Sequence, residues 1–145
     1  MKPRFAGYAE RVRANVAAQG FLRHNGVRIT AIEPGVVELT IDVGNQHTQR
    51  ERFVHGGMMA TLADSSSGLA AMTLLDEGDN ALTVEFKLNF LRPAVGERMV
   101  ARGRVIRAGR RISVMEADIF AVTGDVETPV AKALVTYATV PEQED

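Results

Sequence analysis

The residues that could do chemistry gather between Gln49 and Asp64, in the segment QRERFVHGGMMATLAD. The mostly apolar residues after His55-Gly56-Gly57 predict a buried helix that begins at this triplet. A helix N-terminus has unpaired backbone N–H groups and the positive end of the helix dipole, and glycine lets a bound group come close. The triplet could therefore stabilise negative charge on an oxygen. Two glycines can also serve only as a tight turn into a helix.

Asp64 lies on the same predicted helix, among apolar residues. A carboxylate in such surroundings is costly unless it is paired or takes part in a reaction. It could act as a general base toward water or as a nucleophile toward an acyl carbon. The structural alternative is a local cap or a hydrogen bond to the nearby hydroxyls of Ser65 to Ser67. Together with the His-Gly-Gly triplet, Asp64 favours the functional interpretation.

This segment resembles the PaaI-type hotdog thioesterases, named for phenylacetic acid degradation. Their signature is His-Gly-Gly at the start of the central helix and an aspartate seven residues after the second glycine, here His55-Gly56-Gly57 and Asp64. The order of the elements also matches, so the resemblance covers nearly the whole chain. It implies hydrolysis of an aryl-acyl or medium-chain acyl-CoA, without a cofactor because coenzyme A belongs to the substrate. The N–H of Gly57 would polarise the carbonyl, and Gly56 would contact the substrate.

The spacing of Gly57 and Asp64 predicts a site shared between two subunits. Seven residues at about 100° each return to one helix face, but lie about 10 Å apart along the axis. One thioester carbon cannot contact both residues. The simplest arrangement joins Gly57 of one chain to Asp64 of a partner, as the resemblance also implies. We therefore expect a homodimer or a homotetramer.

Three further catalytic residues follow from the resemblance. Gln49 stands six residues before His55, where relatives commonly have an asparagine that contacts water or the thioester. Thr83 falls near the family's serine or threonine on the strand after the helix, where a hydroxyl could orient the attacking water. His55 could approach the thioester, although orienting the loop is its favoured role. A polar loop residue and a strand-face threonine are the structural alternatives for Gln49 and Thr83.

Arginines surround a predicted turn at Ala108-Gly109. Guanidinium groups bind phosphates through paired N–H donors, and coenzyme A carries a diphosphate and a 3′-phosphate. Arg92, beside Pro93, is expected at the edge of the pantetheine tunnel. The alternative is a set of solvated charges on a hairpin. The cluster comprises Arg104, Arg107, Arg110 and Arg111, of which the last three are expected to bind coenzyme A.

The periodicity of apolar residues predicts the elements that hold these side chains. Helical spacing indicates an amphipathic helix over 1–20 and a buried helix over 55–75. Period-two alternation indicates strands over 36–43, 82–90, 99–105, 115–121 and 131–137, with a hairpin turn at 33–35. Residues 1–145 are therefore expected to form one α+β domain, an antiparallel sheet wrapped around a central helix, with a frayed tail at 141–145. Within 82–90, one face should hold Leu82, Val84, Phe86, Leu88 and Phe90, and the other face Thr83, Glu85, Lys87 and Asn89.

Composition excludes several classes of function. The chain has 145 residues, 46% of them hydrophobic, which suits one core, and its net charge of -1 provides no general attraction to nucleic acid or anionic lipid. Without cysteine there is no thiolate site, and the three histidines lack metal-ligand spacing, so no metal is expected. The motifs of serine hydrolases, NTPases, dinucleotide-binding proteins and zinc proteases are absent. With neither a secretory signal nor a membrane span apparent, we expect a cytoplasmic protein.

Two other functions fit the same resemblance. One is a non-catalytic module that binds or senses acyl-CoA, against which the carboxylate of Asp64 argues. The other is the dehydratase or hydratase branch of the fold, which would require a differently placed histidine with an acidic partner. The sequence shows no such pair.

Overall fold

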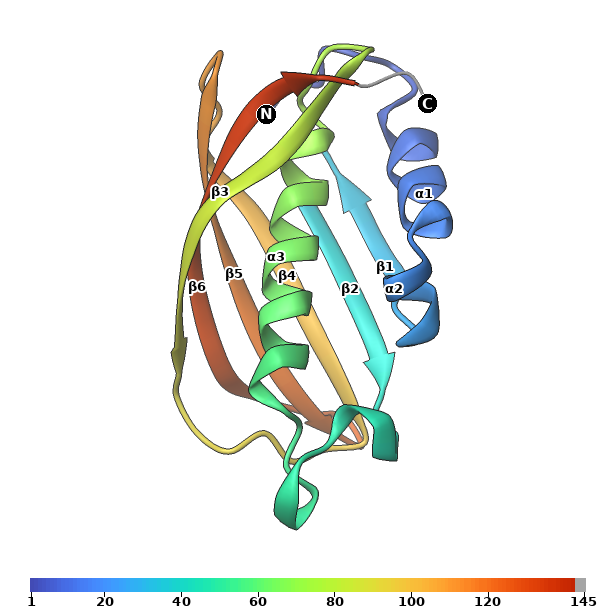
Figure 1. Ribbon diagram of the computed structural model, residues 1–145, viewed down its shortest axis with the longest axis vertical. Helices are drawn as coiled ribbons and strands as arrows, with labels where there is room; N and C mark the ends of the chain where they lie inside the picture. Colours follow the sequence, from blue (N-terminus) through green and yellow to red (C-terminus); the bar gives the residue numbers. More distant parts are fainter. Residues whose placement is uncertain (143–145) are drawn as a thin grey trace.

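A curved antiparallel sheet wraps around one long helix, α3 (Gly56–Met72), in the computed structural model, which describes residues 1–142 (Figure 1). This confirms the α+β hotdog architecture. Two shorter helices, α1 (Tyr8–Ala18) and α2 (Gly20–His24), precede the sheet, and two single-turn 3-10 helices, η1 (Asn45–His47) and η2 (Arg50–Arg52), lie in the loop before α3. The strands are β1 (Arg28–Glu33), β2 (Val36–Asp42), β3 (Asp79–Phe90), β4 (Arg98–Arg107), β5 (Ile112–Thr123) and β6 (Val126–Pro141).

The strand order is β1-β2-β4-β5-β6-β3, so α3 carries the chain from β2 across the sheet to its far edge. The last three strands follow one another through hairpins and fill the gap between β2 and β3. As a result, within residues 1–142, β3 pairs only with β6 and forms one edge of the sheet. The helix that carries the predicted site therefore lies beside an edge strand.

The core lies between α3 and the inner face of the sheet, as the period-two pattern predicts. Leu39, Leu62, Met99 and Ile119 are fully buried there. At Gly103 the backbones of β4 and α3 come so close that an added Cβ would lie 2.2 Å from the carbonyl carbon of Ser66. Glycine at this position lets the backbone of α3 pack directly against the backbone of β4, which sets the distance between the helix and the sheet.

The N-terminal helix is shorter than the predicted range 1–20. It ends at Ala18 because Gln19 leaves the helical conformation at ψ 105°, and a separate short helix begins at Gly20. Val12 and Val16 bury the apolar face of α1. The guanidinium of Arg11 donates to the carbonyl oxygens of Asp76 and Asp79, which ties α1 to the loop after α3.

The predicted alternation along 82–90 is wrong at one point, because β3 contains a bulge. Its register against β6 shifts between Thr83 and Glu85, so Val84 is an extra residue without a partner. Thr83 pairs with Tyr137 and Phe86 pairs with Val135, and both pairs face the helix. Beyond a bulge, the odd-numbered and even-numbered residues of a strand exchange the faces of the sheet to which they point. Thr83 therefore lies on the same face as Phe86, Leu88 and Phe90.

The ends of α3 and of the chain also differ from the predicted bounds. His55 precedes the helix as its N-cap, and residues 73–75 follow it as turns rather than as helix. Pro141 of β6 pairs with Asp79 of β3, and the N–H of Glu142 donates to the carbonyl of Gly78 at 2.7 Å. Neither Pro141 nor Glu142 is therefore frayed. The rest of the predicted tail, 143–145, lies outside the described residues. Within 1–142, no helix is long and apolar enough to cross a membrane.

Candidate active site

Two hydroxyl groups hold the carboxylate of Asp64 in place. Thr83 Oγ1 donates to Asp64 Oδ1 at 2.8 Å, and the hydroxyl of Tyr137 lies 2.9 Å from the same oxygen. The Tyr137 hydroxyl also lies within hydrogen-bonding reach of the Asp64 backbone carbonyl. Among residues 1–142, none donates to Oδ2. One carboxylate oxygen is therefore fixed, while the other stays available.

The neighbouring serines do not bind this carboxylate. Ser67 Oγ donates to the carbonyl oxygen of Ala63 at 2.6 Å and lies 3.1 Å from the backbone oxygen of Asp64. Ser66 Oγ likewise donates to Ala63. Serine hydroxyls in helices commonly bond to a preceding carbonyl in this way. The structural alternative for Asp64, a bond from these serines, is therefore not what the structure shows.

Tyr137 is a site residue that the sequence patterns did not single out. It is the last residue of the predicted strand 131–137, and its hydroxyl reaches Asp64 from β6. Burial raises the pKa of Tyr137 above its usual value, and the nearby charge of Asp64 adds to this. The group is therefore a neutral donor. A large inward-facing side chain with a polar tip needs a partner in the core, and this was the available signal.

At the start of α3, His55 caps the helix. Its Nδ1 accepts a hydrogen bond from the N–H of Gly57 at 2.8 Å, and its carbonyl accepts one from Met58 at 2.9 Å. The N–H of Gly57, which we expected to polarise a carbonyl, is thus already bonded. Within residues 1–142, the N–H of Gly56 donates to no acceptor. The open donor at this terminus belongs to Gly56.

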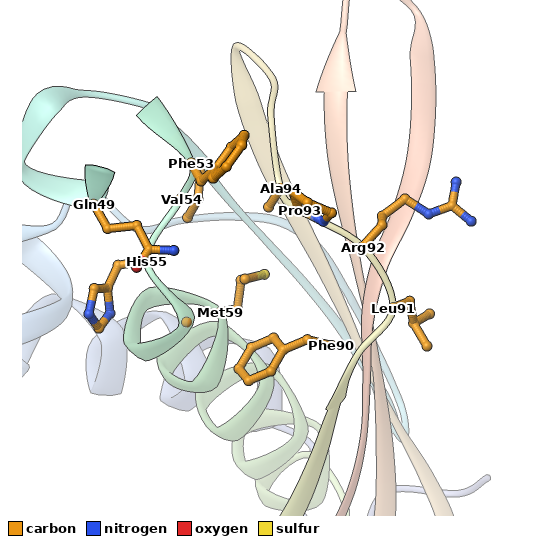
Figure 2. Close-up of a pocket in the computed structure, with 11 residues that line it drawn as sticks. Gln49, Phe53, Val54, His55, Met59, Phe90, Leu91, Arg92, Pro93 and Ala94 are labelled. Atoms are coloured by element: carbon orange, nitrogen blue, oxygen red, sulfur yellow. The ribbon is translucent and has the colours of Figure 1, made fainter. Parts of the chain in front are cut away.

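Gly56 lines a mostly apolar pocket of about 570 Å³ at the end of the molecule where α3 begins. Figure 2 shows Gln49 and His55 on one side of this pocket and Phe90 on the other, with Met59 between them. The side chain of Arg92 extends away from Met59, so its guanidinium lies at the rim (Figure 2). Four predicted site residues therefore meet in one pocket: Gln49, His55, Gly56 and Arg92.

Asp64 lies in a different pocket, of about 200 Å³, which has no lining residue in common with the first. Thr83 and Tyr137 line it together with Asn15 and Gln19 of α1. Within one chain, the predicted site is thus divided into two halves: the loop pocket, lined by Gln49, His55, Gly56 and Arg92, and the Asp64 pocket, lined by Asp64 and Thr83. One chain does not bring these two halves together.

The arginines of the β4–β5 hairpin lie at the other end of α3 from Gly56, nearer to the Asp64 pocket (Figure 1). The carbonyl of Arg111 accepts from Thr139, and Thr139 pairs with Ala81, which lines that pocket. Two strand spacings, about 10 Å, separate Arg111 from Ala81. Arg107 ends β4, and Arg110 lies in the turn. Arg104 instead pairs with Glu116 on the outer face of the sheet.

Comparison with known proteins gives one consistent result. A family model described as the thioesterase superfamily matches residues 52–128. A thioesterase family protein from Silicibacter pomeroyi has a TM-score of 0.91 and 38% identity, covering 93% of this chain and 99% of that chain. A thioesterase from Haemophilus influenzae has a TM-score of 0.80 and 25% identity, covering 90% of this chain and 89% of that chain. Human acyl-coenzyme A thioesterase 13 is 28% identical over 112 residues, 76% of this chain and 79% of that relative. The chain belongs to the thioesterase superfamily, and it is a thioester hydrolase with the PaaI-type hotdog fold.

Proposed function

We propose that this enzyme hydrolyses an aryl-acyl or medium-chain acyl-CoA to the free acid and coenzyme A, at a site shared by two subunits. The observation that carries the proposal is the half-buried carboxylate of Asp64, with Oδ1 fixed by hydroxyls and Oδ2 without a donor among residues 1–142. Such a group suits a general base or a nucleophile. The name of the human relative supports coenzyme A as the leaving group.

The edge strand β3 supports pairing with a second copy. Its unpaired edge is 12 residues long and carries exposed apolar side chains, which is the kind of edge that joins another strand. On α3, small or polar residues recur at helical spacing on the incompletely buried face, and they leave room for a partner. The exposed large apolar residues of β3 are Leu82 (61% exposed), Val84 (57%), Phe86 (40%) and Phe90 (56%).

Antiparallel pairing of β3 with its copy would join the two half-sites. Gly56 and Phe90 line one pocket at the C-terminal end of β3, while Asp64 bonds to Thr83 in the strand's other half. A two-fold axis near the middle of the strand reverses the direction of the partner strand. It therefore brings the Phe90 end of one chain toward the Thr83 half of the other. Each dimer would contain two equivalent sites.

We assign the oxyanion donor to Gly56 rather than to Gly57. The reason is that His55 already accepts the N–H of Gly57, whereas the N–H of Gly56 has no acceptor within residues 1–142 and lies in the loop pocket. At the first position of α3 it also benefits from the positive end of the helix dipole. Gln49 lines the same pocket, where its amide can contact the thioester or the attacking water.

The carboxylate supports two routes to the same products. As a general base, Asp64 takes a proton from water while the water oxygen attacks the carbonyl carbon. The tetrahedral intermediate then collapses, the C–S bond breaks, and the leaving thiolate takes up the proton. As a nucleophile, an Asp64 oxygen displaces the thiolate to form an anhydride, which water hydrolyses to the acid.

The pocket at Gly56 suits the pantetheine arm, since its volume of about 570 Å³ is typical of a small-molecule site and its lining is mostly apolar. Arg92 at its rim would contact a phosphate of coenzyme A. The hairpin arginines Arg107, Arg110 and Arg111 lie nearer to the Asp64 half, so they would reach the nucleotide of a substrate bound across the interface.

The decisive experiment measures release of free thiol from a panel of acyl-CoAs by the wild type and by Asp64→Asn. We expect turnover of aryl-acyl or medium-chain substrates by the wild type and a loss of at least about a hundredfold in the variant. Asp118→Asn, on the outer face beside Lys132, is the matched control and should keep full activity. Equal rates in wild type and Asp64→Asn would refute the proposal. Tight binding without turnover would instead indicate the sensing module.

A further inference from the structure

We infer that Tyr137 is a positioning residue: its hydroxyl fixes Oδ1 of Asp64, so that Oδ2 faces the thioester or the attacking water. This inference rests on the proposed function. It extends that function to a residue of β6, a different strand from the one that carries Thr83. Tyr137 touches neither the predicted oxyanion donor nor the loop pocket, so it would act only through Asp64.

The geometry places two hydroxyl groups beside one carboxylate oxygen, and the Tyr137 hydroxyl also reaches the backbone carbonyl of Asp64. Thr83 Oγ1 lies 2.8 Å and the Tyr137 hydroxyl 2.9 Å from Oδ1 of Asp64. A carboxylate held by a single hydrogen bond can rotate about that contact, whereas two donors from two strands restrict its rotation. Because Thr83 and Tyr137 are paired across β3 and β6, the distance between the two donors is set by the sheet itself.

The protonation state of Tyr137 fits this role. The side chain is 3% exposed, and burial raises its pKa above the usual value. The phenol is therefore held in its protonated form and can donate to a charged carboxylate. Ser67 Oγ lies 3.4 Å from the phenol oxygen, so the oxygen also has a polar neighbour of its own.

A glycine in the middle of α3 makes room for the phenol. A Cβ added at Gly68 would lie 2.7 Å from the Tyr137 hydroxyl oxygen and 2.9 Å from Cε1. Glycine inside a helix costs about 1 kcal/mol relative to alanine. Gly68 lies one turn after Asp64, and any side chain at this position would push the phenol away from the carboxylate.

The test uses full-length Tyr137→Phe, with Tyr8→Phe, the chain's other tyrosine, as the control. We expect kcat to fall between about tenfold and a hundredfold in Tyr137→Phe, the loss of a hydrogen bond to a charged group, with KM unchanged. The acidic limb of the pH–rate profile should move to higher pH, because the carboxylate loses a donor. Tyr8→Phe should match the wild type in all three respects.

Gly68→Ala separates positioning from folding. The substitution should strengthen the helix but displace the phenol, so kcat should fall although the protein remains folded by circular dichroism. In the Tyr137→Phe background it should change kcat little, because no hydroxyl is left to displace. Unchanged kcat and pH profile in Tyr137→Phe would overturn the inference, as would additive losses in the double variant. Failure of the proposed function is distinct, since wild type and Asp64→Asn would then both lack turnover or turn over equally.

Discussion

The imidazole Nδ1 of His55 accepts a hydrogen bond from the backbone N–H of Gly57 at 2.8 Å. The two glycines at the start of α3 therefore differ, because one N–H is bonded within the chain and the other has no acceptor among residues 1–142. The capping contact also sets the direction in which Gly56 enters the helix. Histidine here prepares the helix terminus and leaves a single donor for a substrate.

The cap can be tested by stability. His55→Ala should lower the free energy of unfolding by about 1 kcal/mol, the usual contribution of an N-cap side chain. His55→Asn keeps an acceptor at the same place and should retain most of that stability. Urea unfolding of both variants checks this. Equal losses in the two variants would show that the lost stability does not come from the acceptor of the cap.

The edge strand predicts how the enzyme associates. Phe86→Lys adds a charge beside Lys87 in the middle of β3, and pairing with a second copy would bury it. We expect the sedimentation mass to fall to that of one chain and activity to be lost with it. Val126→Lys, which changes a more exposed apolar residue (66% against 40% for Phe86) at the β5–β6 turn, should do neither. A single chain with full activity would contradict the shared site.

Mixed dimers test directly which residues cooperate. Gly56→Val blocks the approach to the oxyanion donor and Asp64→Asn removes the carboxylate, so each variant alone should be inactive. A dimer with one chain of each kind has one intact site, formed by Gly56 of the second variant and Asp64 of the first. After unfolding and refolding as an equal mixture, activity should return to about a quarter of that of the wild type. Sites confined to single chains would give none.

A pH dependence of stability follows from Glu116 on the outer face of the sheet. Lys132 Nζ lies 2.7 Å from its carboxylate, and hydrogen bonds from Lys132 and then Arg104 lower the pKa of Glu116 below its ordinary value of 4.5. When the pKa of a carboxyl group is lower in the folded protein than in the unfolded chain, its ionised form stabilises the fold at pH values above the unfolded pKa. This stabilisation is lost as the pH falls through the folded pKa.

Glu116→Gln should therefore be less stable than the wild type at neutral pH, and the difference should shrink as the pH is lowered to about 3. Urea midpoints measured over this range provide the comparison. Asp125→Asn, at the exposed β5–β6 turn, is the control and should follow the wild type throughout. A difference that stays constant with pH would show that the ion pairs at Glu116 do not carry the effect.

Most of the fold could be predicted from the sequence because its elements follow simple periodicities. The alternation of β4, β5 and β6 and the apolar length of α3 are local signals, and the structure follows them. The face of Thr83 was not predictable in the same way. A bulge depends on how one strand pairs with another, and no local pattern at Val84 reveals it.

The site was predictable to the extent that it lies in one segment. Gln49, His55 and Gly56 are close in sequence, and they line one pocket. Tyr137 comes from the last strand, so its contact with Asp64 depends on the complete sheet. The bond between His55 and Gly57 was missed for another reason, because a histidine side chain can cap a helix or contact a substrate, and spacing does not distinguish the two.

The extra residue Val84 divides β3 into two segments. Odd-numbered residues face the helix before Val84, and even-numbered residues face it after Val84. The half from Phe86 to Phe90 shapes the loop pocket, and the half with Thr83 serves the carboxylate. If β3 paired with β6 without the bulge, Val84 would take the place of Thr83 opposite Tyr137 and beside Asp64. A shift of the register by one residue in this half of the strand would thus keep the fold and replace the threonine donor by an apolar side chain, which is a short route from a hydrolase to a protein that only binds its ligand.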